Sequence, residues 1–227
     1  MKLLAVDTST TSCSVALLNG DHLLAEAVHA AGGTHSRRLM RMIQRILGDS
    51  GCQPSQIGGL AVTRGPGTFT GLRIGLSTVK GLAAAIQVPV VGVGSLEALA
   101  VPFLFVATPV VVVIDARRGE VYHAHYCCDS GLPRPLGPVQ VGPPEALAAV
   151  LPDDAILVGS GAVLYREVFQ SRSPRIRLAD PTRHLIRAAS VGVLAMERFR
   201  RQDIDALDFL IPEYIRPSDA QIQSGGG

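Results

Sequence analysis

KLLAVDTSTTSCSVALL, residues 2–18, consists of two apolar runs joined by a turn of threonines and serines, and its first run ends in Asp7. PVVVVIDARRGEVYHAHY, residues 109–126, repeats this arrangement with Asp115 in the corresponding place. Short apolar runs that are separated by a polar turn are typical of paired strands. A strand–turn–strand unit that occurs twice, with helical patterns after it, predicts an internally duplicated α/β protein with mixed sheets.

The rest of the chain alternates between strand and helix patterns. An Asn-Gly-Asp turn at residues 19–21 predicts a hairpin that continues the first unit. Apolar residues at helical spacing predict helices at residues 34–47, 71–86 and 188–201. The second strand–turn–strand unit marks a new start, so we predict an N-terminal half at 1–105, a C-terminal half at 106–220 and a disordered tail at 221–227.

Composition limits the classes of protein. Of the 227 residues, 47% are hydrophobic and 18% are charged, which is typical of a globular protein. A net charge of +2 argues against a protein that binds bare nucleic acid through a basic face. Asp7 comes too early for a signal peptide, and no apolar run could span a bilayer, so we expect a cytoplasmic protein without membrane contact. The four cysteines, which form no CxxC pattern, are interpreted as reduced thiols: Cys13, Cys52, Cys127 and Cys128.

RGPGTFTGLRIG, residues 64–75, looks like a phosphate-binding loop but matches neither common motif. A Walker loop needs Lys and Ser or Thr after its last glycine, whereas Leu72 and Arg73 follow here. A dinucleotide fingerprint needs a sixth-place glycine, where Thr70 stands. We therefore interpret the stretch as a turn that packs the following helix closely, with Thr70 as the helix cap. Its structural residues are Gly65, Pro66, Gly67, Thr70 and Gly71.

Four segments together resemble the TsaB family of bacterial tRNA threonylcarbamoyladenosine biosynthesis proteins. They are AVDTSTTSCSVALL (5–18), THSRRLMRMIQRIL (34–47), LAVTRGPGTFTGLRIGLSTVKGLA (60–83) and IDARRGEVYHA (114–124). The resemblance thins after residue 126, although PEYIRP at 212–217 is similar to the family's ending. It implies two actin-like (ASKHA, ribonuclease H-like) halves, each with a mixed sheet flanked by helices.

The resemblance also implies a function. TsaB proteins are non-catalytic partners of the related TsaD transferase, which modifies the adenosine next to the tRNA anticodon, and a separate ATPase, TsaE, joins them. The resemblance implies contact with tRNA through this complex and a self-paired dimer when the chain is alone. The catalytic relatives bind a metal with an HxxxH motif whose places fall on Ser95 and Leu99 here. Neither side chain can replace an imidazole, so we expect no metal and no catalytic residue.

Residues Asp7, Thr8 and Ser9 stand where actin-like folds place their first phosphate loop. This is a weak candidate for nucleotide contact, so we expect no stably bound cofactor and leave ATP or ADP to the assembled complex. The alternative function is a small actin-like ATPase or a sugar or acyl kinase that acts alone, but a nucleotide glycine loop is missing. A peptidase is disfavoured because no nucleophile–base arrangement is recognisable.

The helices at 34–47 and 71–86 are the expected partner surface, because two such helices could meet the same pair on a paralogue. The residues assigned to it are Leu39, Met42, Ile43, Ile46, Leu72 and Leu76. Burial of Met42 in the core is the competing interpretation. The first helix also carries a polar row of arginines, for which a solvated face is favoured over contact with tRNA phosphates: Arg37, Arg38, Arg41 and Arg45.

His123 and His125 share one face of a predicted strand, which is an arrangement that metal sites use. No third ligand has a suitable spacing. We therefore favour an ordinary, half-exposed strand over a metal pair.

Overall fold

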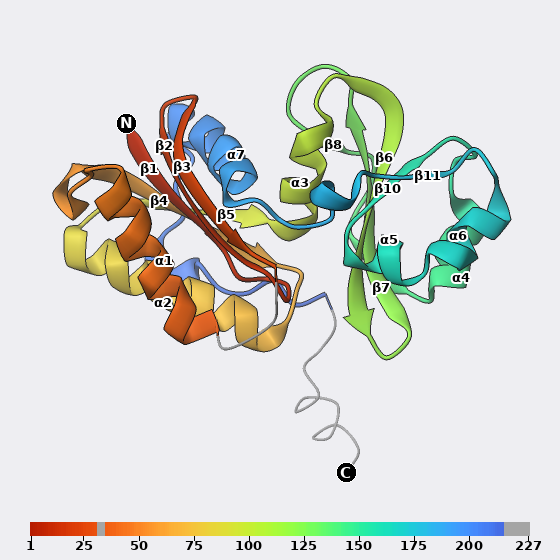
Figure 1. Ribbon diagram of the computed structural model, residues 1–227, viewed down its shortest axis with the longest axis horizontal. Helices are drawn as coiled ribbons and strands as arrows, with labels where there is room; N and C mark the ends of the chain where they lie inside the picture. The colour runs from red at the N-terminus through yellow and green to blue at the C-terminus, as the bar shows by residue number, and fades with distance from the viewer. Residues whose placement is uncertain (31–34, 216–227) are drawn as a thin grey trace, which may run out of the picture.

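The computed structural model describes residues 1–30 and 35–215, which form two mixed β-sheets flanked by helices (Figure 1). The first sheet has the strand order β3-β2-β1-β4-β5. Strand β1 pairs antiparallel with β2 and parallel with β4, and β4 pairs parallel with β5. The strands are β1 (Lys2–Asp7), β2 (Cys13–Asn19), β3 (His22–His29), β4 (Ile57–Gly65) and β5 (Val90–Gly94).

The second sheet repeats the topology of the first. Its order is β11-β10-β6-β7-β8, with β9 also paired to β7. The β6–β7 hairpin corresponds to β1–β2, and β10 lies parallel to β6 as β4 lies parallel to β1. The predicted duplicated α/β fold is therefore confirmed. The strands are β6 (Val106–Arg117), β7 (Glu120–Cys128), β8 (Arg134–Pro135), β9 (Gln140–Gly142), β10 (Ile156–Val158) and β11 (Arg177–Leu178).

Helices cover both faces of the first sheet (Figure 1). Helices α1 (His35–Asp49) and α2 (Phe69–Ile86) pack on one face, and α7 (Ala188–Arg200) packs on the other. Residues 3–6 of β1 are all apolar, as expected for a strand with both faces covered. Leu4 and Val6 belong to the core beneath α1 and α2, whereas Leu3 and Ala5 belong to the core beneath α7.

A central core joins the two sheets. It contains Leu3 and Leu18 of the first sheet, Val110 and Val112 of the second, and Leu99 of α3 (Ser95–Ala100), which lies between the sheets in Figure 1. A third core fills the outer face of the second sheet, under its own helices. Those helices are α4 (Pro144–Val150), α5 (Ser160–Leu164) and α6 (Arg166–Arg172).

The last helix belongs to one predicted half by sequence but packs on the sheet of the other half. Helix α7 falls in the predicted C-terminal half, yet it packs on β1 and β2 of the first sheet. Glu26 of β3 explains part of this placement, because its Oε1 accepts a hydrogen bond from the Ala189 backbone N at 3.0 Å. Glu26 also pairs with Arg187, whose Nε donates to Oε2 at 2.8 Å. A residue of the first sheet thus caps the last helix.

Short connections complete the described chain. Four 3₁₀ helices lie at Pro54–Gln56, Val101–Phe103, Pro181–Arg183 and Leu207–Phe209. None of the helices in the described ranges is both long and apolar enough to cross a bilayer. Thr34, the predicted start of the first helix, and the predicted tail at 221–227 lie outside the described residues.

Candidate functional site

Glycines bring the loop before α2 against the chain that follows β1. A Cβ on Gly67 would lie 2.2 Å from the Ser9 carbonyl O, and one on Gly71 would lie 2.0 Å from the Thr8 carbonyl O. Only glycine permits so close an approach. The Thr68 backbone N donates to the Ser9 O at 2.7 Å, and Thr8 Oγ1 donates to the Gly71 O at 2.7 Å. The glycines of the loop thus hold α2 against the end of β1.

Thr68, and not Thr70, caps α2. The Thr68 backbone is extended, with φ −71° and ψ 134°, and its side chain accepts a hydrogen bond from the Gly71 N at 3.3 Å. Our assignment of the cap to Thr70 was wrong because α2 begins at Phe69, earlier than the apolar spacing indicated. Before the cap, Gly65 adopts φ 132°, a conformation that favours glycine.

Asp7 holds the turn after β1. Its side chain is fully buried, and Oδ1 accepts hydrogen bonds from Ser9 N at 3.0 Å, Ser9 Oγ at 2.6 Å and Thr63 Oγ1 at 2.7 Å. Thr8 is also buried, with its hydroxyl bonded to Gly71. Of the three residues assigned to the phosphate loop, Ser9 lines the pocket described next, and Asp7 and Thr8 are not in its lining.

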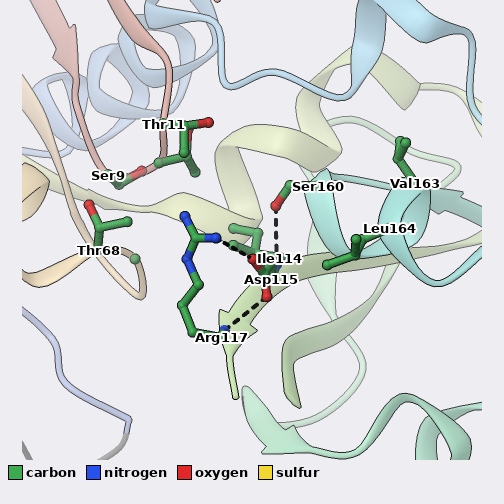
Figure 2. A pocket seen from close by; sticks show the side chains of 11 residues that line it. Ser9, Thr11, Thr68, Ile114, Asp115, Arg117, Ser160, Val163 and Leu164 are labelled. Atoms are coloured by element: carbon green, nitrogen blue, oxygen red, sulfur yellow. Dashed lines mark hydrogen bonds and ion pairs between the residues drawn. The ribbon is translucent and has the colours of Figure 1, made fainter. Parts of the chain in front are cut away.

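That cavity lies between corresponding ends of the two sheets and has a volume of about 350 Å³. The first half contributes the turn after β1 and the loop before α2, and the second contributes the end of β6 and the start of α5 (Figure 2). Its lining residues are Ser9, Thr10, Thr11, Gly67, Thr68, Ile114, Asp115, Arg117, Ser160, Val163 and Leu164. The duplicated fold therefore places both halves around one hydroxyl-rich pocket.

An ion pair occupies the wall of this pocket. Arg117 reaches from the β6–β7 hairpin toward Ser9 and Thr68 in Figure 2. Its backbone N donates to Asp115 Oδ1 at 2.9 Å, and its Nη1 lies 3.2 Å from Oδ2. The Asp115 N donates in turn to Ser160 Oγ at 3.1 Å. Arg117 has φ 64°, which is uncommon for a residue with a side chain, so these contacts hold a strained position.

Asp115 was recognised from the sequence as the counterpart of Asp7, whereas Arg117 and Ser160 were not assigned to a site. The signal was present, because IDARRGE carries the acidic turn and GSG at 159–161 follows a strand as the first glycine loop does. The sequence could not show that the ends of the two sheets face each other across a pocket. Their relative orientation depends on the packing of the central core.

Ser95 is the first residue of α3, and Leu99 lies in its last turn. The resemblance aligns this helix with the HxxxH motif of the catalytic relatives. Both side chains are almost completely buried, at 0% and 1% exposure. Leu99 packs in the central core, and Ser95 Oγ is buried with no hydrogen-bond partner among the described residues. In the described ranges, no group of three or more His, Cys, Asp or Glu side chains could share a metal ion.

The apolar stripe assigned to the partner surface lies mostly inside the protein. Five of its residues have exposures of 3% or less, and four of these belong to the core beneath α1 and α2. They are Leu39, Ile43, Ile46, Leu72 and Leu76. The structure corrects the expectation that these five side chains lie at the surface, because they pack inside the protein. Met42 is half-buried against that core. Contact of α1 and α2 with a partner stays a prediction.

The thiols are poorly suited to nucleophilic chemistry. Burial raises the pKa of Cys13 to about 11, with a further contribution from the negative charge of Asp7. Burial likewise raises the pKa of Cys128 to about 11. Both are therefore neutral thiols at pH 7, which is the unreactive form. All four cysteines are free.

Comparison with known proteins identifies the family. The family model of TsaD, tRNA N6-adenosine threonylcarbamoyltransferase, matches residues 29–224. The chain is 34% identical to the tRNA threonylcarbamoyladenosine biosynthesis protein TsaB of Haemophilus influenzae, over 95% of this chain and 94% of that protein. The chain belongs to the TsaB family. It is also 43% identical to TsaB of Escherichia coli, over 56% of this chain and 55% of that protein.

Solved structures agree with membership of the TsaB family. YeaZ from Pseudomonas aeruginosa superposes with a TM-score of 0.82 at 35% identity, covering 94% of this chain and 99% of that one. The ROK hexokinase from Thermus thermophilus superposes with a TM-score of 0.51 at 14% identity, covering 87% and 100%. The second likeness shows the fold alone, which is the actin-like fold. The TsaB family is thus linked to tRNA threonylcarbamoyladenosine biosynthesis.

Proposed function

We propose that this chain is the non-catalytic subunit that binds and activates a TsaD-like transferase during tRNA N6-threonylcarbamoyladenosine synthesis. The observation that carries the proposal is the state of α3. Ser95 and Leu99 stand at the places of the metal-binding histidines of the catalytic relatives, and both are buried. Neither side chain is a metal ligand of the kind that such a site requires. The family membership supports the pathway, and the side chains of α3 support the non-catalytic role.

The pocket between the halves supports the same assignment. Its lining contains one cation, Arg117, which is neutralised by Asp115. A polyphosphate is usually held by excess positive charge or by a loop of free backbone N–H groups at a helix start. Here the loop before α2 directs the Thr68 N to the Ser9 carbonyl. The chain alone therefore holds no nucleotide stably in this proposal, and ATP or ADP binds within the assembled complex.

The partner surface in this proposal is the exposed side of α1 and α2. It consists of Met40 and Gln44 on α1 with Ser77, Gly81 and Ala84 on α2, all of which are exposed. Residues that recur every three or four positions form one helix face, and small side chains allow another helix to pack closely. The same face can meet the matching helices of a TsaD-like paralogue or of a second copy. A TsaE-like ATPase and tRNA then join through the complex, in the cytoplasm.

The test is a pull-down with the TsaD-like protein of the same cell, followed by a tRNA modification assay with and without this chain. Met40→Glu should weaken pairing by tenfold or more and lower modification, because it places a charge in a desolvated contact. Leu132→Glu is the matched control, since Leu132 has 39% exposure against 38% for Met40 but lies in the second half. ATP-dependent turnover by the isolated chain would instead support the small-kinase alternative.

A further inference from the structure

We propose that His123 and His125 form a two-imidazole site for a divalent transition-metal ion, such as Zn²⁺, Ni²⁺ or Cu²⁺, in a pocket on the second sheet. The site is separate from the pocket between the halves and from the exposed side of α1 and α2. Sequence reasoning favoured an ordinary strand here because no third ligand was recognisable. The fold adds a cavity, a buried nitrogen without a partner and a workable ring geometry.

The cavity results from an interruption at the edge of the second sheet. Strand β8 pairs with β7 at Tyr126 and Cys127. Strand β9 pairs with β7 at residues 121–123, where Gln140 lies opposite His123. Between these two pairings the chain leaves β7 and opens a pocket of about 300 Å³. The pocket is lined by His123, His125, Leu136, Gly137, Pro138, Gln140 and Val150. Both imidazoles therefore face a space in which an ion and its water ligands fit.

The ring geometry is close to that of a shared ion. The centroids of the His123 and His125 rings lie 6.2 Å apart, with an angle of 71° between the planes. Because zinc binds an imidazole nitrogen at about 2.0 Å, two rings around one ion have centres roughly 5.2 Å apart at a tetrahedral angle and about 6.4 Å apart at a linear one. A tetrahedral site thus needs an approach of about 1 Å, which rotation of the half-exposed His125 can provide.

His123 has an unsatisfied nitrogen. Its side chain is 7% exposed, and within the described part of the chain Nδ1 is buried without a hydrogen-bond partner. Buried polar atoms are nearly always paired, and a rotation of the His123 ring toward the pocket would let an ion or a water molecule reach this nitrogen.

Two protein nitrogens leave the remaining coordination positions to water or to a small ligand in the pocket. We therefore expect a labile site, which loses its ion during purification with a chelator and regains it when metal is added. Imidazole nitrogen favours Zn²⁺, Ni²⁺ and Cu²⁺ over Mg²⁺ and Ca²⁺, which prefer oxygen. Mg²⁺ should consequently fail to compete for the site.

The experiment uses tag-free, chelator-treated full-length protein and titrates Zn²⁺ by calorimetry, with Co²⁺ absorption as a second readout. The expected result is one ion per chain, with the affinity lowered at least tenfold in both His123→Asn and His125→Asn. His22→Asn, which changes an exposed histidine of β3, is the matched control and should bind as the unchanged protein does. Circular dichroism and thermal melting test whether each variant is folded.

Three outcomes overturn the proposal. The first is the absence of stoichiometric binding, which would leave a water molecule as the occupant of the pocket. The second is binding that survives both histidine substitutions. The third is a Co²⁺ spectrum with a strong thiolate charge-transfer band, which would place the ion on the cysteines instead. Because His125 is half-exposed, His125→Asn tests the site even if His123→Asn fails to fold.

Discussion

At the scale of single residues, the glycine loop lies so close to the end of β1 that a Cβ on two of its glycines would clash with the backbone. Gly67 and Gly71 are required there by the neighbouring carbonyl oxygens of Ser9 and Thr8. Gly65 is the glycine of this loop with a positive φ. The reason at Gly67 is lack of space.

Gly67→Val should therefore destabilise the protein strongly, by about 3 kcal/mol or more, because a β-branched side chain would force apart the loop and the turn after β1. Thr68→Ala removes a helix cap and should cost only about 1 kcal/mol. Gly81→Ala is the control, since a Cβ there meets nothing within 4 Å, and it should leave stability equal or slightly higher. Urea unfolding measures all three. A mild Gly67→Val would show that the loop can move away from Ser9.

The histidines of β7 predict a dependence of stability on pH. Burial lowers the pKa of His123 and His125 in the folded chain, whereas the unfolded chain keeps the ordinary value of about 6.5. Below that value the unfolded state binds more protons than the folded one, so the free energy of unfolding should fall as the pH decreases from 7 to 5. The stabilisation is fully present above the unfolded pKa.

The double variant His123→Asn/His125→Asn should show a shallower fall over the same interval, measured by urea unfolding with a chelator present. The interval from pH 7 to 5 lies above the range in which ordinary carboxylates are protonated. The single variant His22→Asn should keep the original slope. If the double variant kept it as well, burial of these imidazoles would not be the cause of the pH dependence.

At the scale of elements, helix α7 depends on a residue that is distant in the sequence. The side chain of Glu26 is 5% exposed, and it binds both Arg187 and the Ala189 backbone N at the start of the helix. A carboxylate at a helix N-terminus satisfies free N–H groups and interacts favourably with the helix dipole. Glu26 thus fixes the start of α7 on the first sheet.

Glu26→Ala should lower the free energy of unfolding by about 2 kcal/mol, because it removes hydrogen bonds between charged and buried groups. Asp49→Ala is the matched control. It removes the exposed pair of Arg45 and Asp49, whose side chains are 80% and 68% exposed, and should change stability by no more than about 0.5 kcal/mol. Chemical denaturation compares the two. Equal effects would mean that the buried position of Glu26 adds nothing.

Elements with a clear period were predictable, and their long-range placement was not. The strand ending in Asp7, the hairpin turn at residues 19–21 and helices α1, α2 and α7 were predictable from apolar spacing and turn residues, whereas α4, α5 and α6 were not predicted. The end of α7 matched to one residue, yet its docking on the first sheet depends on Glu26. The stripe on α1 was recognised correctly as apolar, but spacing alone does not distinguish a face that meets a partner from one that meets its own sheet.

For the candidate site, the sequence marked the first half better than the second. Ser9, Gly67 and Thr68 belong to segments that the sequence marked as candidate loops. Arg117 and Ser160 could be assigned to the pocket only once the fold was known. Their strands meet across a pocket because the central core orients the sheets. Hydrogen bonds such as that from Asp115 N to Ser160 Oγ link residues 45 positions apart, and local patterns carry no information about them.

At the scale of the whole molecule, the duplicated fold gives the chain two corresponding sheet ends and one pocket between them. The resemblance implies that the catalytic relatives bind a metal on the helix between the sheets. Here that helix, α3, is packed with buried side chains, including Leu99 at 1% exposure. This packing of α3 fits the proposal that the chain leaves the chemistry to a TsaD-like partner.

The central core has a consequence for motion. Leu3 and Leu18 of the first sheet and Val110 and Val112 of the second are buried in the same cluster, so opening one sheet exposes apolar surface of the other. Amide hydrogen exchange should then report one shared opening event: the slowest amides of β1 and of β6 should exchange with the same free energy. Calorimetry should show a single transition. Such a body cannot close around a ligand as two hinged lobes can, so its partners meet a surface of fixed shape.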